Sequence, residues 1–201
     1  MKKVRAIIVI VVILAASFAY AHIAKANMIY DKSIDSSEYL TTGVVEGTVE
    51  QKFVSAENSL NGISVKCQLN GDTTGAKVVM ELSDEETGEV IARSELKADD
   101  MKNGKFNTFS FPEIQNCNGR SFQVQFENEN VDVKLGCGIS FSFQNKSEEN
   151  TELIINGNET EGTLILKTIT DRFDLETFCV LLLMIAYIAG FLWFLSKLFG
   201  K

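Results

Sequence analysis

The sequence predicts an all-β domain that folds as an antiparallel two-sheet β-sandwich, flanked by N- and C-terminal transmembrane helices. Short segments that alternate apolar and polar residues follow one another through the middle of the 201-residue chain, separated by Asn, Asp and Gly. Parallel strands need long crossover connections, usually helices, and no amphipathic helix lies between these segments. The strands are therefore predicted to pair antiparallel. Long uncharged runs lie near both ends of the chain.

The C-terminal run predicts a membrane-spanning helix within residues 173–201. No residue from Thr177 to Ser196 is charged, and twenty residues span roughly 30 Å as a helix, the thickness of the hydrocarbon core of a bilayer. Trp193 lies near the downstream boundary, where aromatic rings favour the headgroup region. Lys197 and Lys201 follow the run and indicate a cytoplasmic C-terminus.

The N-terminal segment, residues 1–26, supplies a second apolar run. Basic residues precede nineteen uncharged positions from Ala6 to Ala24, so this end stays in the cytoplasm and the middle of the chain is exported. Ala19-Tyr20-Ala21 and Ala24-Lys25-Ala26 resemble cleavage sites of a signal peptide, whereas the length of the run is typical of a retained anchor. The chain is therefore a one-pass or a two-pass membrane protein.

The region between these runs divides into a polar tether at 27–47 and a sandwich at 48–172. Segments with inward-facing apolar residues predict the strands, and Pro112 confines its strand to a sheet edge or a strand end. Val131, Val133 and Leu135 are predicted to continue the inward pattern. The predicted strands are 48–55, 62–69, 77–82, 89–96, 105–111, 121–127, 139–143, 153–155 and 163–169.

Charge limits the partners of the exported region. Residues 27–176 hold thirteen Lys/Arg against all twenty-seven Asp/Glu, a net charge of −14. Such an acidic surface argues against nucleic acid and anionic lipid headgroups, and is compatible with soluble carbohydrate, cations or basic proteins.

Three cysteines fall outside the predicted membrane helices, which leaves their redox state open. Cys67 shares strand parity with Ile63 and Val65, so we interpret it as a small core residue. Cys117 and Cys137 both lie in turns rich in Asn and Gly, where a disulfide between them is a candidate.

The residues that common enzymes need are missing. The only histidine, His22, belongs to the N-terminal run, which excludes Ser-His-Asp and Cys-His nucleophiles and histidine-bound zinc from the exported region. The chain is therefore not predicted to be an enzyme, and it holds no cofactor motif. Acidic turns such as Asp84-Glu85-Glu86 offer oxygens for Ca²⁺ but lack the spacing of a dedicated loop, so we interpret them as solvated turns.

Sugar binding would have to use polar contacts. The exported region has no Trp, and its tyrosines, Tyr30 and Tyr39, fall in the predicted tether, so the sandwich offers neither of the two side chains that commonly stack on sugars. Its phenylalanines mostly fall on the inward side of the strands and are interpreted as core. Outward polar residues are the candidate ligand contacts: Asn107, Arg120, Gln123 and Gln125.

The middle of the chain also resembles a known ectodomain. The residues that carry the resemblance are Gln51-Lys-Phe53, Leu60-Asn-Gly-Ile63, Val78-Val-Met-Glu-Leu82-x-Asp84, Thr87-Gly88-Glu-Val-Ile91, Ala98-Asp-Asp-Met101, Phe109-x-Phe111-Pro112 and Gly119-Arg-Ser-Phe122-x-Val124. Over about residues 45–145 the chain is similar to the jelly-roll ectodomains of bacterial cell-envelope proteins, many of which assemble polysaccharides and carry glycosyltransferase-like membrane regions. These positions are turn and core residues, so the resemblance implies a jelly-roll-like sandwich and no catalytic residue.

Two functions follow as hypotheses. The first is a non-catalytic binding or accessory subunit of cell-surface glycan assembly, partnered by a membrane glycosyltransferase or an envelope glycan. The second is a structural or signalling membrane protein that acts through its helices, with the sandwich as a spacer. A luminal cargo receptor is disfavoured because no heptad stretch precedes the last helix.

Overall fold

The computed structural model describes residues 2–199, without the side chains of residues 2, 3, 5–7, 22, 23 and 172. Two compact units form: one is Ala26–Thr170, and the other combines Met1–Lys25 with Asp171–Lys201. The first is the β-sandwich and the second holds the two apolar helices. The side chains of the basic N-terminal residues 2, 3 and 5, and the whole of Lys201, lie outside the described residues.

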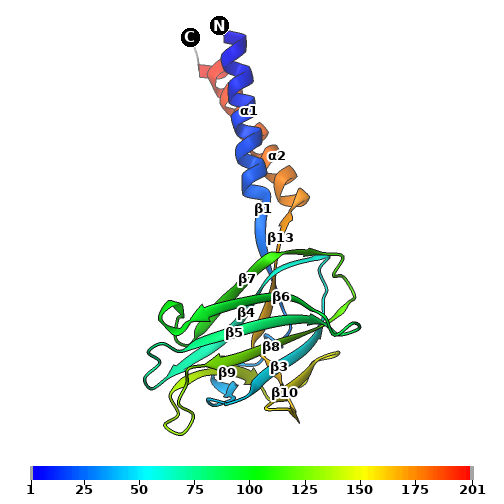
Figure 1. Cartoon of the computed structure of the whole chain (residues 1–201). Coiled ribbons are helices and arrows are strands. Elements are labelled where there is room, and N and C mark those ends of the chain that lie inside the picture. Colours follow the sequence, from blue (N-terminus) through cyan, green and yellow to red (C-terminus); the bar gives the residue numbers. More distant parts are fainter. Residues whose placement is uncertain (1, 200–201) are drawn as a thin grey trace. The chain divides into compact units, whose positions relative to one another are not determined.

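Two antiparallel sheets make up the sandwich (Figure 1). The six-stranded sheet has the order β11 (Asn158–Thr160), β10 (Glu152–Ile155), β3 (Thr48–Val54), β8 (Ser121–Glu129), β5 (Lys77–Asp84) and β6 (Val90–Lys97). The seven-stranded sheet has the order β1 (His22–Met28), β13 (Leu166–Phe173), β4 (Ser59–Asn70), β9 (Gly138–Gln144) and β12 (Thr163–Leu164), while β7 (Lys105–Gln115) pairs with β4 and β2 (Leu40–Thr41) with β9. The chain alternates between the sheets at most of its connections. This arrangement confirms the predicted sandwich.

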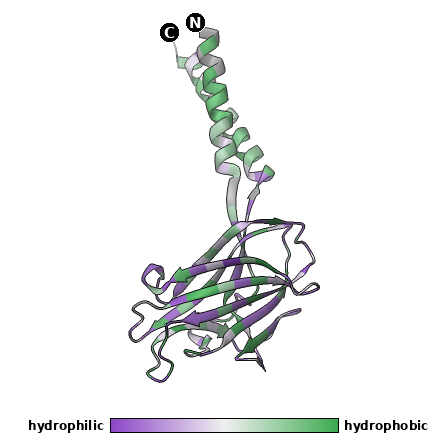
Figure 2. Ribbon diagram, in the orientation of Figure 1, coloured by the Kyte–Doolittle hydropathy of each residue, from purple (hydrophilic) through white to green (hydrophobic). Residues whose placement is uncertain are grey.

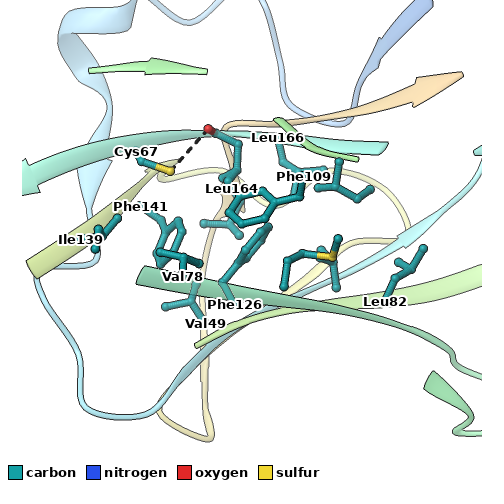
Figure 3. Close-up of a cluster of buried hydrophobic side chains, with 14 of the residues drawn as sticks. Val49, Cys67, Val78, Leu82, Phe109, Phe126, Ile139, Phe141, Leu164 and Leu166 are labelled. Atoms are coloured by element: carbon teal, nitrogen blue, oxygen red, sulfur yellow. Dashed lines mark hydrogen bonds between the residues drawn. The ribbon is translucent and has the colours of Figure 1, made fainter. Parts of the chain in front are cut away.

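Alternation along the strands builds the core between the sheets. Buried rings meet at its centre: Phe126 of β8 lies 5.5 Å from Phe109 of β7 and 5.0 Å from Phe141 of β9, measured between ring centroids. Figure 3 shows these rings between the sheets, with Cys67 of β4 and aliphatic side chains around them. The inward assignment of Cys67 is confirmed, because its side chain is fully buried in this core.

The segment predicted as a tether, 27–47, is instead part of the sandwich. Its strand β2 pairs with β9, and Val45 joins the hydrophobic core. Ser140 and Ser142, which point to the outer face of β9, are only 1 % exposed. The tether prediction is wrong because a polar segment can join a sheet through backbone hydrogen bonds, which leave no apolar pattern in the sequence.

Two local features of the strands depend on special residues. Pro112 lies within β7, an edge strand that pairs only with β4, at the point where the register between the two strands shifts. An edge strand with an irregular register accommodates proline, which has no N–H to donate. Val131 packs against the core as predicted, but no strand forms over residues 131–135. Val133 and Leu135 belong to a turn closed by the bridge between Asp132 and Cys137, and Leu135 is 77 % exposed.

The second unit contains α1 (Lys2–Ala21) and α2 (Leu175–Phe199), both strongly apolar (Figure 2). The Asp174 carboxylate accepts the N–H groups of Glu176 and Thr177 at 3.0 and 3.2 Å, which caps the start of α2. In the described part of the chain α2 is the one helix long and apolar enough to cross a membrane, while the shorter apolar part of α1 is Ile8–Ala21. Phe18 and Phe173 pack within this unit, 5.2 Å apart.

The four cysteines are free thiols, and the candidate disulfide is contradicted by the geometry. The Cys117 N–H bonds the Asn58 carbonyl immediately before β4, whereas Cys137 lies against Gly71 immediately after it. The twelve residues of β4 separate them, roughly 36 Å of extended chain, and a disulfide requires Cα atoms within about 7 Å.

We expect the thiols to react in a fixed order. Burial raises the pKa of Cys67 to about 12 and also raises the pKa of Cys117, while Cys137 is partly exposed. In a Cys179→Ser variant, a thiol-specific reagent at pH 8 should label Cys137 in the native protein, and Cys67 and Cys117 only after unfolding, as mass spectrometry of peptides would show. Labelling of Cys67 as fast as Cys137 in the native protein would contradict the burial.

Candidate functional site

The predicted contacts on β8 lie together on the outer face of the six-stranded sheet. Gln123 and Gln125 are half-buried, and the Gln123 amide donates to Glu50 at 2.7 Å. Gln125 lies in register between Glu50 of β3 and Glu81 of β5. Both glutamines are thus already surrounded by the side chains of neighbouring strands.

Arg120, just before β8, is held in a structural ion pair. Its guanidinium bonds the buried Asp84 carboxylate and lies 5.5 Å from the centre of the Phe122 ring. Asp84 also accepts the N–H groups of Thr87 and Glu86 at 3.0 and 2.9 Å. The Thr87 hydrogen bond, followed by Arg120, holds the pKa of Asp84 below its usual range against the opposing effect of burial. Asp84, the first carboxylate of the acidic turn considered for Ca²⁺, is therefore already bound by groups of the protein itself.

Asn107 is separate from these residues and belongs to the other sheet. Its side chain is 6 % exposed, accepts the Lys102 N–H at 2.7 Å and donates to the carbonyls of Lys102 and Lys105, both at 3.1 Å. These bonds close the turn before β7. The prediction that Asn107 contacts a ligand is therefore contradicted by its burial and its occupied polar atoms.

Cations on the six-stranded face are paired with acids from adjacent strands. Lys52 lies 2.9 Å from Glu152, Lys77 lies 3.0 Å from both Glu95 and Glu129, and Arg93 contacts Glu81. Exposed pairs of this kind contribute little stability, about 0–1 kcal/mol each. Their consequence is that these three cations have no free charge to offer a ligand.

The largest opening among those described is a hollow of about 630 Å³ beside the connection from β9 to β10, which we term the β9–β10 hollow. Smaller hollows of about 270 and 360 Å³ share Thr151 with it. Ligand sites in proteins commonly occupy about 300–1,000 Å³. The hollow falls in this range and its lining is mainly polar: it is formed by Asn27, Met28, Ile29, Phe53, Val54, Ala56, residues 146–151 and Thr168.

A buried amide fixes the loop that forms the hollow. The Gln144 side chain accepts the Asp31 N–H at 3.0 Å and donates to the Lys146 carbonyl at 3.2 Å and the Glu148 carboxylate at 3.0 Å. Thr163 accepts the Glu148 N–H at 3.1 Å. Two segments that are distant in sequence, around residues 31 and 148, are thereby held in one geometry.

The charge of the hollow is mostly negative. Lys146 is neutralised by Asp31 at 2.7 Å and Glu148 at 3.2 Å, and its hydrogen bond to Asp31 is the main cause of a lowered Asp31 pKa. Glu149 lines the hollow as well. The adjacent hollow of about 360 Å³ is lined by Glu152, Glu159 and Glu161. This surface suits neutral polyhydroxylated or cationic ligands better than anions. Within the described residues, no three His, Cys, Asp or Glu side chains are grouped to hold a metal ion.

Sequence reasoning did not find this hollow. Its polar lining comes from a loop of ordinary composition, and its shape depends on Gln144, a fully buried residue that bonds the distant Asp31 N–H. No local pattern in residues 146–151 signals a site. The one available signal was a glutamine at the end of an alternating strand, next to a polar loop.

The comparisons with known proteins give a limited result. No protein-family model matches the chain, and no curated protein matches its sequence. Among solved structures, a xylan-binding module CBM15 is similar over 75 % of this chain and 99 % of that chain, with 10 % identity and a TM-score of 0.35. A likeness at this level supports no functional assignment.

Proposed function

We propose that this chain is a non-catalytic, membrane-anchored binding or accessory module of cell-surface glycan assembly. In this proposal α2 anchors the chain with its C-terminus in the cytoplasm, α1 is a retained second anchor, and the sandwich is a jelly-roll-like extracytoplasmic domain. Its partner is an envelope glycan or a membrane glycosyltransferase. The observation that carries the proposal is the open, polar β9–β10 hollow on a sandwich that is continuous in sequence with an apolar helix of spanning length.

The chemistry of the hollow supports a glycan as the ligand. Hydroxyl, amide and backbone groups of residues 146–151 can exchange hydrogen bonds with sugar hydroxyls, while Ile29 and Val54 offer apolar contact to a ring face. The paired charges nearby disfavour an anion. Residues 27–176, which contain the whole lining of the hollow, hold no histidine and so lack the common general base, and holding a ligand is better supported than cleaving one.

Filling the hollow tests the proposal. Ala56 is exposed and lines the hollow, whereas the exposed Asn58, two residues further on, does not line it. The full chain in nanodiscs should bind neutral glycan fragments released from its own cell envelope, and Ala56→Trp should weaken that binding at least tenfold while Asn58→Trp leaves it unchanged. Binding would be measured by calorimetry, and the unfolding temperature would confirm that both variants are folded.

Two results would contradict the proposal. One is a wild-type chain that neither binds these glycans nor co-purifies with a glycosyltransferase. The other is equal loss of binding in the two tryptophan variants, which would place the contact elsewhere on the sandwich.

A second function rests on α2. A Cβ built at Gly190 meets nothing within 4 Å, and Ala186 lies one turn before it, so this side of the helix can approach another helix closely. In that function the helix recognises a membrane partner and the sandwich acts as a spacer. Exchanging α2 for an unrelated membrane helix would abolish activity if this alternative holds, and would preserve it if the sandwich is the binding element.

A further inference from the structure

An aromatic cluster lies on the outer face of the seven-stranded sheet, and none of its residues lines the β9–β10 hollow. The Tyr30 ring stacks with Phe106 at a centroid distance of 6.3 Å and meets the edge of Tyr39 at the same distance. The Lys167 ammonium lies 3.7 Å from the centre of the Phe106 ring, and the Lys66 ammonium lies 5.0 Å from that of Tyr39. We term these five residues the Tyr30–Phe106 platform.

Strand pairing explains why the platform forms. Phe106 of β7 is the partner of Lys66 on β4, and Lys167 of β13 is the partner of Ser64, two positions along β4. Side chains two residues apart on a strand share a face, so both lysines and Phe106 point to the outside of the sheet. Tyr30 and Tyr39 arrive from the segment that was predicted to be a tether. The structure therefore supplies the stacking aromatics that the sequence placed outside the sandwich.

The cations of the platform have no carboxylate partner. Within the described part of the chain neither Lys66 nor Lys167 forms an ion pair, in contrast to Lys52, Lys77 and Lys146, each of which contacts two acids. All five platform residues are partly exposed. In a region of net charge −14, the platform places two such lysines on one aromatic surface.

Charges of both signs surround the platform. Burial, followed by the charge of Lys32, lowers the pKa of Lys167 below its usual range, so an anion beside it would relieve an existing electrostatic penalty. On the other side, burial followed by the charges of Asp35 and Asp31 raises the pKa of Tyr39, although Asp31 is paired with Lys146. The platform thus combines an exposed aromatic surface with two lysines that form no ion pair among the described residues.

We propose that the Tyr30–Phe106 platform binds a carboxylate-bearing sugar, such as a hexuronate unit of a glycan. The apolar face of the sugar ring stacks on the exposed parts of Tyr30 and Tyr39, and its carboxylate takes charge-assisted hydrogen bonds from Lys66 and Lys167. Lysine supplies a point charge on a flexible stem, which suits one carboxylate on a ring of variable pose. This surface goes beyond the proposed function, because the β9–β10 hollow disfavours anions and is lined by other residues.

The test compares two ligands that have the same sugars and differ in whether each carboxyl group is free or methyl-esterified. The full chain in nanodiscs of neutral lipid is titrated with a galacturonate tetramer and with its methyl-esterified form, which has the same sugars without the carboxylates. The acidic tetramer is expected to bind at least tenfold more tightly, and its affinity should fall as salt is raised. Equal binding of both tetramers, or no binding of the acidic one, would overturn the proposal.

Matched lysine variants locate the contact. Lys66→Gln combined with Lys167→Gln should weaken binding of the acidic tetramer at least tenfold, whereas Lys97→Gln combined with Lys134→Gln removes the same charge from exposed positions off the platform and should change it less than twofold. An equal loss of affinity in the two double variants would mean that binding depends only on the net charge of the protein, and this would overturn the proposed site. Inorganic phosphate as a competitor shows whether any anion suffices: displacement of the tetramer at equal concentration would overturn the sugar assignment.

The tests of the Tyr30–Phe106 platform and of the β9–β10 hollow give distinguishable results. Ala56→Trp should leave binding of the acidic tetramer unchanged, and the double glutamine variant should leave binding of neutral envelope glycans unchanged. The unfolding temperature of each variant identifies any loss of fold, and Tyr39→Phe, which keeps the stacking ring, should retain binding in the acidic titration.

Discussion

Replacing Phe126 with alanine is expected to lower the free energy of unfolding of the sandwich by about 3–5 kcal/mol. Phe126 is fully buried at the centre of the core, between Phe109 and Phe141, and no part of its side chain reaches solvent. Truncation removes its burial and both ring contacts, and it leaves a cavity that two sheets held by backbone hydrogen bonds cannot close. Because domains are typically stable by only about 5–15 kcal/mol, this is a large fraction of the total.

Urea unfolding of the full chain in nanodiscs, followed by tyrosine fluorescence, measures this change. Val90→Ala is the control, since Val90 lies on the edge strand β6 and is 50 % exposed; its effect should stay within about 0.5 kcal/mol. Similar effects of the two substitutions would contradict a core centred on Phe126.

The second large effect is expected at Gln51, a fully buried amide of β3 that links the two sheets. Its oxygen accepts the Leu164 N–H of β12 at 2.8 Å, and its nitrogen donates to the carbonyls of Glu152 and Lys52, both at 3.0 Å. Gln51→Leu keeps the approximate volume but leaves the buried Leu164 N–H without a partner. An unsatisfied buried group costs about 1–3 kcal/mol, so we expect the free energy of unfolding of the variant to fall by about 1–3 kcal/mol.

Gln123→Leu is the matched control for Gln51→Leu. Gln123 lies on the neighbouring strand and is partly exposed, so its lost bond to Glu50 is replaced by water and the expected change is below about 1 kcal/mol. Hydrogen exchange adds a local readout: the Leu164 amide should lose protection in Gln51→Leu while the centre of β8 keeps it. Unchanged protection at Leu164 would contradict the role of Gln51 as a link between the sheets.

Strands buried on one face were predictable from the sequence. Along β8, inward Phe122 and Val124 alternate with half-buried polar neighbours, and burial follows that alternation because side chains of a strand point to opposite faces. Ile63 and Val65 of β4 are inward by the same rule, although Ser64 between them is buried too. The same rule explains why the core position of Cys67 could be inferred without any structural knowledge.

Pairing between segments that are distant in the sequence could not be predicted from the local pattern of apolar and polar residues. Val133 and Leu135 continue an alternating pattern but lie in a turn, because Asp132 and Cys137 pair with each other and leave no partner strand for them. Leu40 and Thr41 are both exposed, yet they pair with β9 as a strand. In both cases the decisive contact is a backbone pairing, which side-chain periodicity does not reveal.

The candidate sites follow the same division. Gln123 and Gln125 were placed correctly on one outward face, since that inference needs only strand parity. The β9–β10 hollow and the Tyr30–Phe106 platform both depend on where residues 27–47 fold, and a polar segment with two tyrosines carries no sign of which sheet it will cover. Sites built from side chains of several distant segments are therefore the part that required the structure.

The central claim is that the sandwich lies outside the membrane, and the partly exposed Cys137 tests it directly. Intact cells that express the full Cys179→Ser chain are treated with a membrane-impermeant maleimide, and a Cys137→Ser variant reports the background. The proposed topology predicts labelling of Cys137 in intact cells, at the level reached after the cells are opened. Labelling that occurs only after opening would place the sandwich in the cytoplasm and contradict an extracytoplasmic glycan-binding module.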